Sequence, residues 1–478
     1  MRTDLMSDIA TALRDIKQVL GPRGWIDDPQ DMAPYLAEAR GRFVGVALLV
    51  ARPETTAEVA AVMAICHRHR IPVVPQGGNT GLVGGSIPYE AGNELVLSLG
   101  RLKRIRAIDT TDDTMTVEAG CILADLQRAA AEIDRLFPLS LGAEGSCQIG
   151  GNLATNAGGT MTIAYGNARE LVLGLEVVLA DGRIWNGLRR LHKDNTGYDL
   201  KHLFIGSEGT LGVITAAVVR MFPRPRQVET ILAAIPDPTA AITLLPRLRA
   251  ATGDALTGYE LMARIALDFA YAHLPDLIDP LSEPAPWYLL IEAGSGPGDG
   301  LRPAMENALA AAFDDGLVQD AAFAESEAQR AQLWRLREAI VEAQKFEGGS
   351  IKNDISVPIS VIPEFLERAI AAVTDAIPGC RPVPFGHVGD GNIHFNISQP
   401  VGAERTAYLA RWDEVTHRIH DIIVSLEGSI SAEHGVGRFK REELSRFKSP
   451  VELDLMRRIK TAFDPEGLLN QGKLIPEP

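Results

Sequence analysis

Three glycine-rich blocks in the first half of the chain constrain its fold most strongly. They occupy residues 75–86, 146–159 and 206–215. Glycine tolerates positive φ and close approach of a backbone, so successive N–H groups in such loops can converge on a diphosphate. The first block is neither GxGxxG before a helix nor GxxxxGK[ST], which excludes a Rossmann or a P-loop reading. One such block is compatible with a structural turn, but three in one region favour a binding role.

Composition restricts the class of protein. A chain of 478 residues predicts roughly two to four domains, and 46% apolar with 23% charged residues is typical of a globular enzyme. The net charge of -15 argues against a surface for nucleic acid or anionic membrane, since both need clustered Lys and Arg. No segment approaches the ~20 uninterrupted apolar residues of a membrane span.

The cysteines and the N-terminus indicate a cytoplasmic, reducing location. The four cysteines (Cys66, Cys121, Cys147 and Cys380) lie far apart and form no CxxC, so they encode neither a thiolate zinc knuckle nor an iron–sulfur run. The N-terminal segment 1–21 reads as an amphipathic helix with acids among its bases. It lacks the apolar core of a secretory signal and the acid-poor character of an organelle presequence.

Hydrophobic periodicity divides the chain into two α+β regions. In the first, we expect helices at 8–20, 57–70 and 121–133, strands at 71–76, 94–99, 104–109 and 115–120, and a hairpin at 171–185. After the prolines at 223 and 225, we expect helices at 239–251, 303–313, 329–346 and 403–427, and strands at 286–294 and 350–358. This pattern predicts an antiparallel sheet with helices on one side. The expected domains are 1–222 (core from about residue 40), 223–428 and a closing segment 429–478.

A cluster of histidines and a carboxylate predicts a metal site with a nearby base. His387 and His394 flank a sharp turn in GHVGDGNIHFN, and Glu433 and His434 are adjacent in SAEHGVG. Two imidazoles and one carboxylate leave an open position on a divalent metal. The unperturbed histidine pKa of ~6.5 suits His434 as a general base. Asp390, between two glycines, is expected to have a turn role. The other histidines lack such a context, and we read them as structural or exposed.

The motifs resemble a known flavoprotein superfamily. GGNTGLVGG, IGGNLATNAGG and IGSEGTLGVIT, in this order and spacing, resemble the FAD-binding domain of the vanillyl-alcohol oxidase/p-cresol methylhydroxylase superfamily. The tail FDPEGLLNQGK resembles its C-terminal flavin-contacting segment, with Gln471 where proline is usual. With the histidine motifs, the chain from about residue 40 is similar to the FAD-binding D-2-hydroxyacid dehydrogenase branch. That branch includes D-lactate dehydrogenases, D-2-hydroxyglutarate dehydrogenase and the D subunit of glycolate oxidase.

The resemblance implies a fold and a set of flavin contacts. The fold would be α+β: a two-subdomain FAD-binding domain of p-cresol methylhydroxylase type, a substrate (cap) domain with an antiparallel sheet, and a C-terminal segment that returns to the flavin. The first loop contains no histidine for covalent attachment, so we expect dissociable FAD. The residues expected to contact it are Pro75, Gly77, Gly78, Asn79, Thr80, Gly81, Gly84, Gly85, Ser146, Gly150, Gly151, Asn156, Gly158, Gly209, Ile214 and Asn470.

The resemblance also implies substrate contacts. Arg337 and Lys352 match positions that anchor the substrate's carboxylates, and Asn396 is expected beside them. From the residues alone, Arg337 and Lys352 are equally compatible with solvated surface charges. The hydroxyglutarate enzymes are expected to carry Thr or Ser four residues after the arginine, where this chain has Val341. That departure removes a hydroxyl contact and leaves the choice among D-2-hydroxy acids open.

The expected activity is oxidation of a D-2-hydroxy acid, of the D-lactate or D-2-hydroxyglutarate type, to the 2-oxo acid. FAD would accept the hydride at N5, Zn²⁺ or another divalent metal would be held by His387, His394 and Glu433, and His434 would act as base. An electron carrier such as a quinone or electron-transfer flavoprotein would reoxidise the flavin, and a homodimer is expected. Two alternatives remain: a metal-free oxidase that reduces oxygen, and a flavin-binding subunit of a glycolate oxidase-like complex that needs an iron–sulfur partner.

Overall fold

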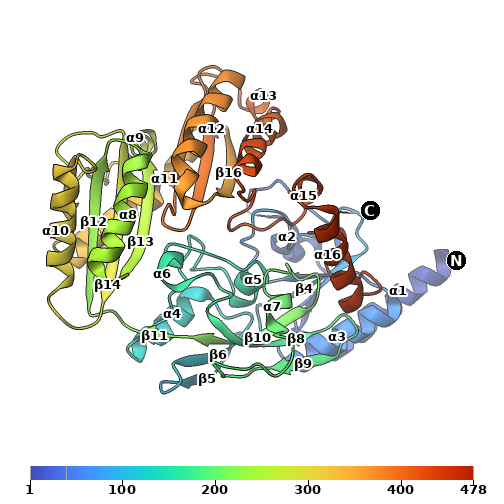
Figure 1. Cartoon of the computed structure of the whole chain (residues 1–478). Coiled ribbons are helices and arrows are strands. Elements are labelled where there is room, and N and C mark those ends of the chain that lie inside the picture. Colours follow the sequence, from blue (N-terminus) through green and yellow to red (C-terminus); the bar gives the residue numbers. More distant parts are fainter. Residues whose placement is uncertain (1, 39, 477–478) are drawn as a thin grey trace. The chain divides into compact units, whose positions relative to one another are not determined.

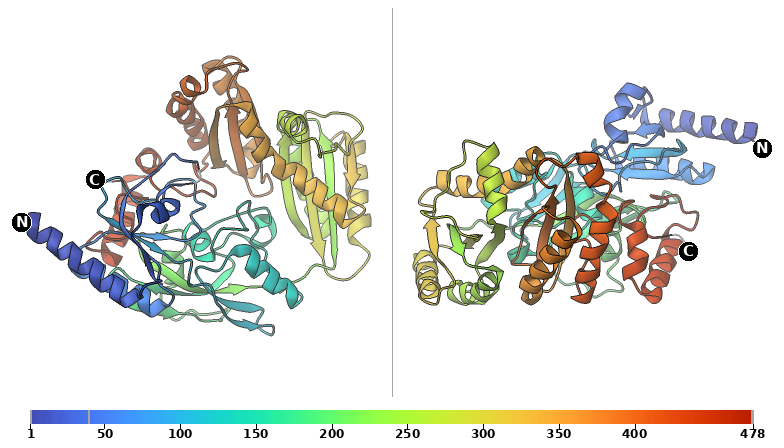
Figure 2. Two further views of the ribbon diagram at one scale, coloured as in Figure 1. Left: turned by 180° about the vertical axis from the view of Figure 1, so that it is seen from behind. Right: turned by 90° about the horizontal axis from the view of Figure 1, so that it is seen from above.

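The computed structural model describes residues 2–38 and 40–476, and the chain divides into two compact units (Figures 1 and 2). The first unit consists of Met1–Ala157, Asn167–Pro223 and His434–Pro478. The second consists of Gly158–Gly166 and Arg224–Glu433. Residues 158–166 therefore belong to the second unit, although the sequence on either side of them belongs to the first. Residues 434–478, which follow the second unit in the sequence, belong to the first.

The first sheet of the first unit carries the first glycine-rich block. It contains β1 (Trp25–Ile26), β2 (Ala47–Ala51), β4 (Glu94–Ser98) and β3 (Val73–Gln76) in that order. Strands β2, β4 and β3 are parallel, and helices α1 (Arg2–Leu20) and α3 (Thr56–His69) contribute to the hydrophobic core of this sheet. Because β3 ends at Gln76, the block begins at the carboxyl end of a parallel strand.

The second sheet of the first unit is antiparallel. Its order is β5 (Ile105–Asp109), β6 (Thr114–Glu118), β10 (Val213–Arg220), β8 (Val172–Val178) and β9 (Ile184–Gly187). The hairpin predicted at 171–185 is confirmed as β8 and β9, with Gly182 at a φ of 87° in its turn. The predicted helices and strands up to residue 133 are also confirmed, with ends shifted by one or two residues except where α1 extends the first helix to Arg2.

The remaining elements of the first unit are short, apart from two helices. They are α2 (Pro29–Leu36), α4 (Leu123–Glu132), β7 (Arg135–Leu136), α5 (Ile149–Ala154), α7 (Lys201–Phe204), β11 (Phe222–Pro223), α15 (Arg441–Phe447) and α16 (Pro450–Phe463). The last helix begins with a capping box: Ser449 accepts from the backbone of Glu452, whose carboxylate accepts from the backbone of Ser449.

A seven-stranded antiparallel sheet forms the centre of the second unit. Its order is β15 (Asp320–Phe323), β12 (Gln227–Ile235), β14 (Trp287–Ser295), β13 (Leu256–Ala263), β17 (Arg381–Gly386), β18 (Asn392–Ser398) and β16 (Ser350–Ser356). Its helices are α6 (Thr162–Tyr165), α8 (Pro238–Thr252), α9 (Arg264–His273), α10 (Leu301–Asp314), α11 (Glu327–Ala343), α12 (Ile362–Ala376), α13 (Arg405–Leu409) and α14 (Trp412–Ser425), with 3-10 turns η1 (Gln344–Glu347) and η2 (Ile359–Val361).

Helices cover both faces of this sheet, so the prediction of helices on one side is wrong. In β12, Ile231 and Ala233 belong to the core that includes α8, α10, α12 and α14. Leu232 and Ala234 belong to a second core with α9 and α11. Side chains alternate between the faces of a strand, so these two cores lie on opposite faces. Strands buried on both faces are continuous apolar runs, which is how β12 and β14 read in the sequence.

The single helix predicted over 403–427 is also wrong, because the chain forms two helices there. Helix α13 ends at Leu409 and α14 begins at Trp412. Glu404 caps α13 by accepting hydrogen bonds from the backbone N–H groups of Thr406 and Ala407. The buried Tyr408 donates a 2.8 Å hydrogen bond to the carbonyl of Ile397 on β18. This bond fixes α13 to the sheet separately from α14.

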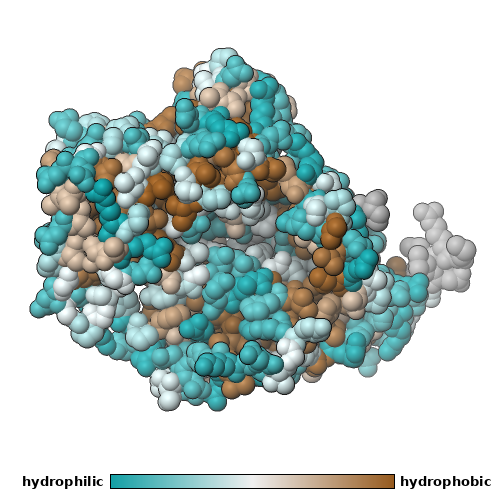
Figure 3. Space-filling view, viewed as in Figure 1, coloured by the Kyte–Doolittle hydropathy of each residue, from teal (hydrophilic) through white to brown (hydrophobic). Residues whose placement is uncertain are grey.

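Hydrophilic side chains cover most of the visible surface in Figure 3, with an apolar patch over α16. Val451, Leu455 and Ile459 of that helix are exposed by 67%, 52% and 38%. They lie four residues apart and therefore form one stripe along the helix. Among the described helices, none combines the length and the apolar character that crossing a membrane requires.

Candidate active site

Polar residues of two neighbouring strands share one face of the second unit's sheet. In β18, Ile393 and Phe395 join the hydrophobic core on the α12 side, so His394 and Asn396 lie on the opposite face. In β16, Lys352 and Asp354 are the register partners of Asn396 and His394. The alternation of side chains along two paired strands therefore brings four polar residues together.

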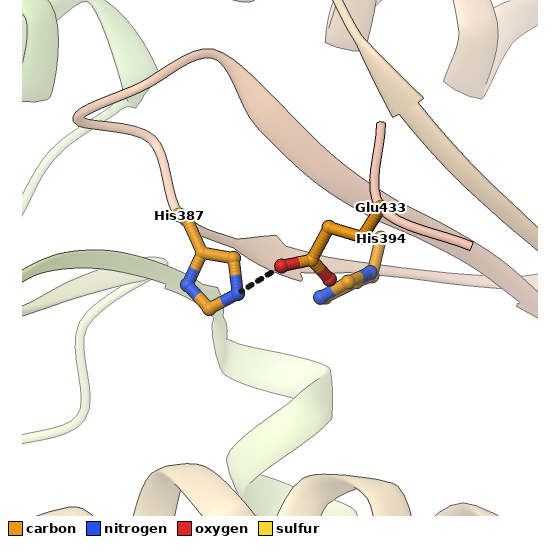
Figure 4. A group of neighbouring side chains, drawn as sticks. All are labelled: His387, His394 and Glu433. Carbon is orange, nitrogen blue, oxygen red and sulfur yellow. Dashed lines mark ion pairs between the residues drawn. The ribbon is translucent and has the colours of Figure 1, made fainter. Parts of the chain in front are cut away.

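His387, His394 and Glu433 form a cluster of possible metal ligands within the second unit (Figure 4). Ligand atoms from the three side chains all lie within 4.8 Å of one another. Nε2 of His387 is 3.6 Å from Oε1 of Glu433, and the two imidazole centroids are 5.5 Å apart. The turn between the histidines is stabilised by Asp390, whose carboxylate accepts a 3.1 Å hydrogen bond from the backbone of Asn392. The predicted turn role of Asp390 is confirmed.

Glu260 of β13 joins His387 to Arg337. One carboxylate oxygen contacts Nδ1 of His387, and the other accepts a 2.7 Å hydrogen bond from Nε of Arg337. Glu260 is fully buried. Burial alone would raise the pKa of Glu260, but the charges of His387 and Arg337 and their hydrogen bonds hold it at about 2. Burial would likewise lower the pKa of His387, but the charge and hydrogen bond of Glu260 raise it to about 9.

Asp354 connects the other two members of the cluster. Its Oδ1 lies 3.5 Å from Nδ1 of His394, and its Oδ2 accepts a 3.0 Å hydrogen bond from the backbone N–H of Glu433. The side-chain amide of Asn392 donates a further 3.0 Å hydrogen bond to Asp354. Asp354 therefore holds His394 of β18 and the main chain of Glu433 close together.

The donor set fits a divalent transition metal. Each imidazole faces a carboxylate through Nδ1, Glu260 for His387 and Asp354 for His394, and Nε2 of His387 faces the carboxylate of Glu433. Metal-bound histidines are commonly oriented by a carboxylate in this way. Two imidazoles and a carboxylate match zinc or a similar metal with an open position. The carboxylates of Glu260, Asp354 and Glu433 bring negative charge to the cluster, which a divalent cation would offset.

Helix α11 carries Arg337, one of the three candidate substrate-binding residues. Arg330 and Trp334 of this helix donate hydrogen bonds to buried Glu292 of β14, and Arg337 bonds to Glu260 of the neighbouring strand. The carboxylates of Glu292 and Glu260 on the sheet thus fix the position of α11. Only Nε of Arg337 has a hydrogen-bond acceptor among the described residues, so its two terminal nitrogens can take an anion.

Asn396 of β18 and Val341 of α11 belong to the same unit as Arg337. The amide nitrogen of Asn396 donates a 2.9 Å hydrogen bond to Gln344, which is buried after the last turn of α11. Lys352 lies opposite Asn396 in the β16–β18 register. Val341, one turn after Arg337, is 45% exposed. The structure therefore gathers Arg337, Lys352 and Asn396 in the unit that holds the histidine cluster.

His434 follows Glu433 directly in the chain and belongs to the first unit. The loop after it contains two glycines in the left-handed region, Gly435 at a φ of 79° and Gly437 at 53°. The backbone N–H groups of Val436 and Gly437 donate to the carboxylate of Glu208. This loop therefore contacts the third glycine-rich block.

The first glycine-rich block has the backbone of an anion-binding loop. Among the described residues, the backbone N–H groups from Gly77 to Gly81 have no hydrogen-bond acceptor. Asn79 adopts a φ of 54°, and its side chain donates to the carbonyls of Pro34 and Ala37 and accepts from Ser86. A Cβ on Gly78 would lie 2.3 Å from the carbonyl oxygen of Ser146. The loop is thus fixed by side chains while its N–H groups stay available.

The other blocks lie close to the first. Gly77 faces Gly151 of the second block, since a Cβ on Gly77 would lie 3.5 Å from the nitrogen of Gly151. In the third block, a Cβ on Gly209 would lie 3.4 Å from Pro75 and 3.3 Å from the amide of Asn470. The residues predicted to contact FAD all belong to the first unit, except Gly158, which belongs to the second unit.

Sequence reasoning missed Glu260 and Asp354. Glu260 lies in a strand that is buried throughout, and Asp354 lies between the buried Asn353 and Ile355; burial of a charge signals a partner. That signal was present in the strand sequences LTGYELMA and SIKNDIS. The identity of the partners depends on sheet order, which no local pattern contains.

Comparison with known proteins identifies the family to which this fold belongs. The model of FAD linked oxidases, C-terminal domain, matches residues 224–474, and the FAD binding domain model matches residues 47–187. A D-2-hydroxyglutarate dehydrogenase of Xanthomonas citri pv. viticola is 40% identical, with 94% of this chain and 93% of the relative covered. The mitochondrial D-2-hydroxyglutarate dehydrogenase of Bos taurus is 39% identical, with 94% and 81% covered. A probable mitochondrial one of Oryza sativa subsp. japonica is 37% identical, with 96% and 81% covered.

Solved structures show the same fold at low identity. p-Cresol methylhydroxylase with substrate bound has a TM-score of 0.76 at 17% identity, covering 98% of this chain and 97% of the other. Alkyldihydroxyacetonephosphate synthase has a TM-score of 0.72 at 17% identity, covering 96% and 84%. The predicted α+β fold of p-cresol methylhydroxylase type is confirmed. The chain belongs to the FAD-linked oxidase family and is an FAD-dependent oxidoreductase of its D-2-hydroxyacid dehydrogenase branch.

Proposed function

We propose that this protein oxidises D-2-hydroxyglutarate to 2-oxoglutarate with dissociable FAD and a divalent metal, zinc in the first instance. The observation that carries the proposal is the cluster of His387, His394 and Glu433 with Arg337, which Glu260 holds beside His387. The names of the relatives support the substrate, since those from cattle and Xanthomonas are named D-2-hydroxyglutarate dehydrogenases and the one from rice a probable one.

The substrate has two carboxylates, and Arg337 and Lys352 of the second unit provide two positive charges. We assign one carboxylate to the terminal nitrogens of Arg337, because a guanidinium held through Nε presents a fixed fork of donors. Lys352 and Asn396, which are register partners on β16 and β18, would receive the other polar groups of the substrate. Val341 offers no hydroxyl to the substrate, so binding relies on charge.

His434 would accept the hydroxyl proton on an imidazole nitrogen. A bound divalent cation, held by His387, His394 and Glu433, would lower the pKa of the substrate hydroxyl toward that of histidine. FAD, when bound, supplies the acceptor for the α-hydrogen and its electron pair. The hydroxyl oxygen becomes the keto oxygen, so one proton and one hydride leave the substrate. The protein's own residues orient the substrate and take the proton.

The flavin is assigned to the first unit, by the backbone N–H groups of Gly77 to Gly81 and by the adjoining second and third blocks. Successive unpaired N–H groups are suited to a diphosphate. The domain assignment 1–222, 223–428 and 429–478 follows this division of roles, with the last segment contributing Asn470. We propose a quinone or an electron-transfer flavoprotein as the final electron acceptor.

We also propose a homodimer in which α16 pairs with its copy. Its exposed stripe consists of Val451, Leu455 and Ile459, with Leu455 at the centre. A two-fold antiparallel pairing would bury the stripes of both copies against each other. The compartment is proposed to be the cytoplasm, with mitochondria as the alternative, because the rice and cattle relatives are named mitochondrial.

The proposal is tested by mixing flavin-loaded protein anaerobically with D-2-hydroxyglutarate, D-lactate, glycolate and L-2-hydroxyglutarate, and following flavin bleaching by stopped flow. We expect D-2-hydroxyglutarate to bleach the flavin fastest and the L-enantiomer to fail. Failure of all four, with flavin bound, would point to a subunit that needs an iron–sulfur partner. Steady peroxide formation by chelated protein would point to the metal-free oxidase.

A further inference from the structure

Glu208, in the third glycine-rich block, has an unusual conformation for a buried acid. Its φ is 52°, in the left-handed region that non-glycine residues rarely adopt, and its side chain is buried. Backbone strain of this kind persists only where surrounding contacts enforce it. The contacts of Glu208 lead to the segment that follows the proposed base.

The carboxylate of Glu208 lies inside the loop that follows His434. Oε1 accepts a 2.7 Å hydrogen bond from the backbone of Val436, and Oε2 accepts one of 2.7 Å from Gly437. Successive N–H groups that converge on one anion form a backbone nest. Hydrogen bonds between a carboxylate and backbone N–H groups are charge-assisted and stronger than neutral ones.

The glycines of the HGVG segment are explained by this contact. Gly435 has a φ of 79°, and a Cβ there would lie 2.7 Å from Oε1 of Glu208. Gly437 has a φ of 53°, and a Cβ there would lie 2.4 Å from the carbonyl oxygen of Val83. The loop can therefore close around the carboxylate only with glycine at both positions.

The main chain of Glu208 is itself fixed. Its carbonyl accepts a 2.6 Å hydrogen bond from the amide of Asn470, whose backbone N–H bonds to the carbonyl of Val73 on β3. A continuous set of hydrogen bonds thus runs from the parallel sheet through Asn470 and Glu208 to the backbone two residues after His434. All of these residues belong to the first unit.

We propose that Glu208 is a positioning residue for His434. It holds the backbone after the base through the N–H groups of Val436 and Gly437, and so sets where the imidazole stands without contacting the substrate itself. The inference rests on the proposed function, since it assumes that His434 is the base. A base displaced by about 1 Å can lose about 100-fold in rate.

The test is Glu208→Gln, which keeps the size of the side chain but replaces one acceptor oxygen by an NH₂ group. That group would face a backbone N–H, so one of the two hydrogen bonds is lost. We expect the rate of flavin reduction by D-2-hydroxyglutarate at saturation to fall between 10- and 100-fold. KM, FAD stoichiometry and metal content should change less than twofold. A parallel loss of bound FAD or of metal would assign Glu208 a general structural role and overturn the inference.

A double-mutant cycle with His434→Ala makes the test specific, with single-turnover flavin reduction as the readout. If Glu208 acts through His434, Glu208→Gln has no further effect once the imidazole is absent. An undiminished effect in the His434→Ala background would refute the inference. The matched control is Glu118→Gln, which removes another buried carboxylate of the first unit, one bonded to Arg104 and Arg106. It should leave flavin reduction unchanged. If wild-type protein fails to oxidise the substrate, the proposed function fails first.

Discussion

Nε of Arg337 on α11 donates a 2.7 Å hydrogen bond to Glu260 on β13, and both side chains are more than nine-tenths buried. The other oxygen of Glu260 contacts His387. One carboxylate therefore orients the proposed substrate anchor and a proposed metal ligand together. A change at Glu260 would therefore affect both the proposed substrate binding by Arg337 and the proposed metal binding by His387.

Glu260→Gln should weaken both functions. The amide retains one acceptor but loses the charge that supports Arg337 and His387. Loss of a carboxylate behind a ligating histidine typically lowers metal affinity by about 10- to 100-fold. We expect a decrease of this size in zinc affinity, measured by competition with a chromophoric chelator, and a higher KM for D-2-hydroxyglutarate.

Glu292→Gln is the matched control. Glu292 is also a buried glutamate on this sheet under α11, but its partners are Arg330, Trp334 and Thr230. This variant should lower the thermal midpoint and leave zinc affinity unchanged. Equal zinc affinities for Glu260→Gln and the wild type would contradict the role given to Glu260.

Features encoded by short stretches of sequence could be predicted, whereas contacts that depend on the order of strands in the sheet could not. The glycine blocks, the β8–β9 hairpin and the pair His387 and His394 are local patterns, so their spacing was sufficient. Glu260 is 127 residues from His387, and the contact exists only because β13 neighbours β17 in the sheet. The break between α13 and α14 was missed because an apolar period continues through it, while the bond of Tyr408 to β18 is a tertiary contact.

Removing the metal should abolish turnover without removing the flavin. The predicted ligands all lie in the second unit, while the backbone N–H groups assigned to the diphosphate lie in the first. Dialysis against a strong chelator should therefore lower kcat/KM by at least about 100-fold, since the proposed cation would acidify the hydroxyl, and leave the flavin absorbance unchanged. Zinc should restore activity to wild-type protein but not to His394→Ala. Full activity after complete metal removal, verified by elemental analysis, would rule out metal dependence.

Val341→Thr should improve the use of a dicarboxylate. Val341 lies one turn after Arg337, and its exposed side chain can be replaced without disturbing the core. An added hydroxyl that bonds to a carboxylate contributes about 0.5–1.5 kcal/mol, which corresponds to roughly two- to tenfold. We expect kcat/KM to rise by this factor for D-2-hydroxyglutarate and to stay constant for D-lactate. A serine variant should give a smaller gain, and an equal gain for both substrates would contradict the assignment.

Lys473 predicts a pH dependence of stability for the flavin-free protein. Burial lowers the pKa of Lys473 from 10.5 to about 7. Between these two values the unfolded chain binds more protons than the folded one, so this group favours folding more strongly as pH rises through the window. Lys473→Met should therefore remove part of the rise in unfolding free energy between pH 7 and 10, measured by denaturant titration. The exposed Lys103, replaced by methionine, is the control and should leave the slope as in the wild type.

Leu455→Glu should separate the proposed dimer. Leu455 is 52% exposed at the centre of the α16 stripe, and a charge there would be buried in a two-fold pairing. We expect the dimer dissociation constant, measured by sedimentation equilibrium, to rise by at least about 100-fold, because burying an unpaired charge costs several kcal/mol. Val451→Glu should also weaken the dimer, since Val451 lies on the same stripe. Val401→Glu, at an apolar residue that is 85% exposed in the other unit, should have no effect. A dimer that tolerates both α16 variants would have its interface elsewhere.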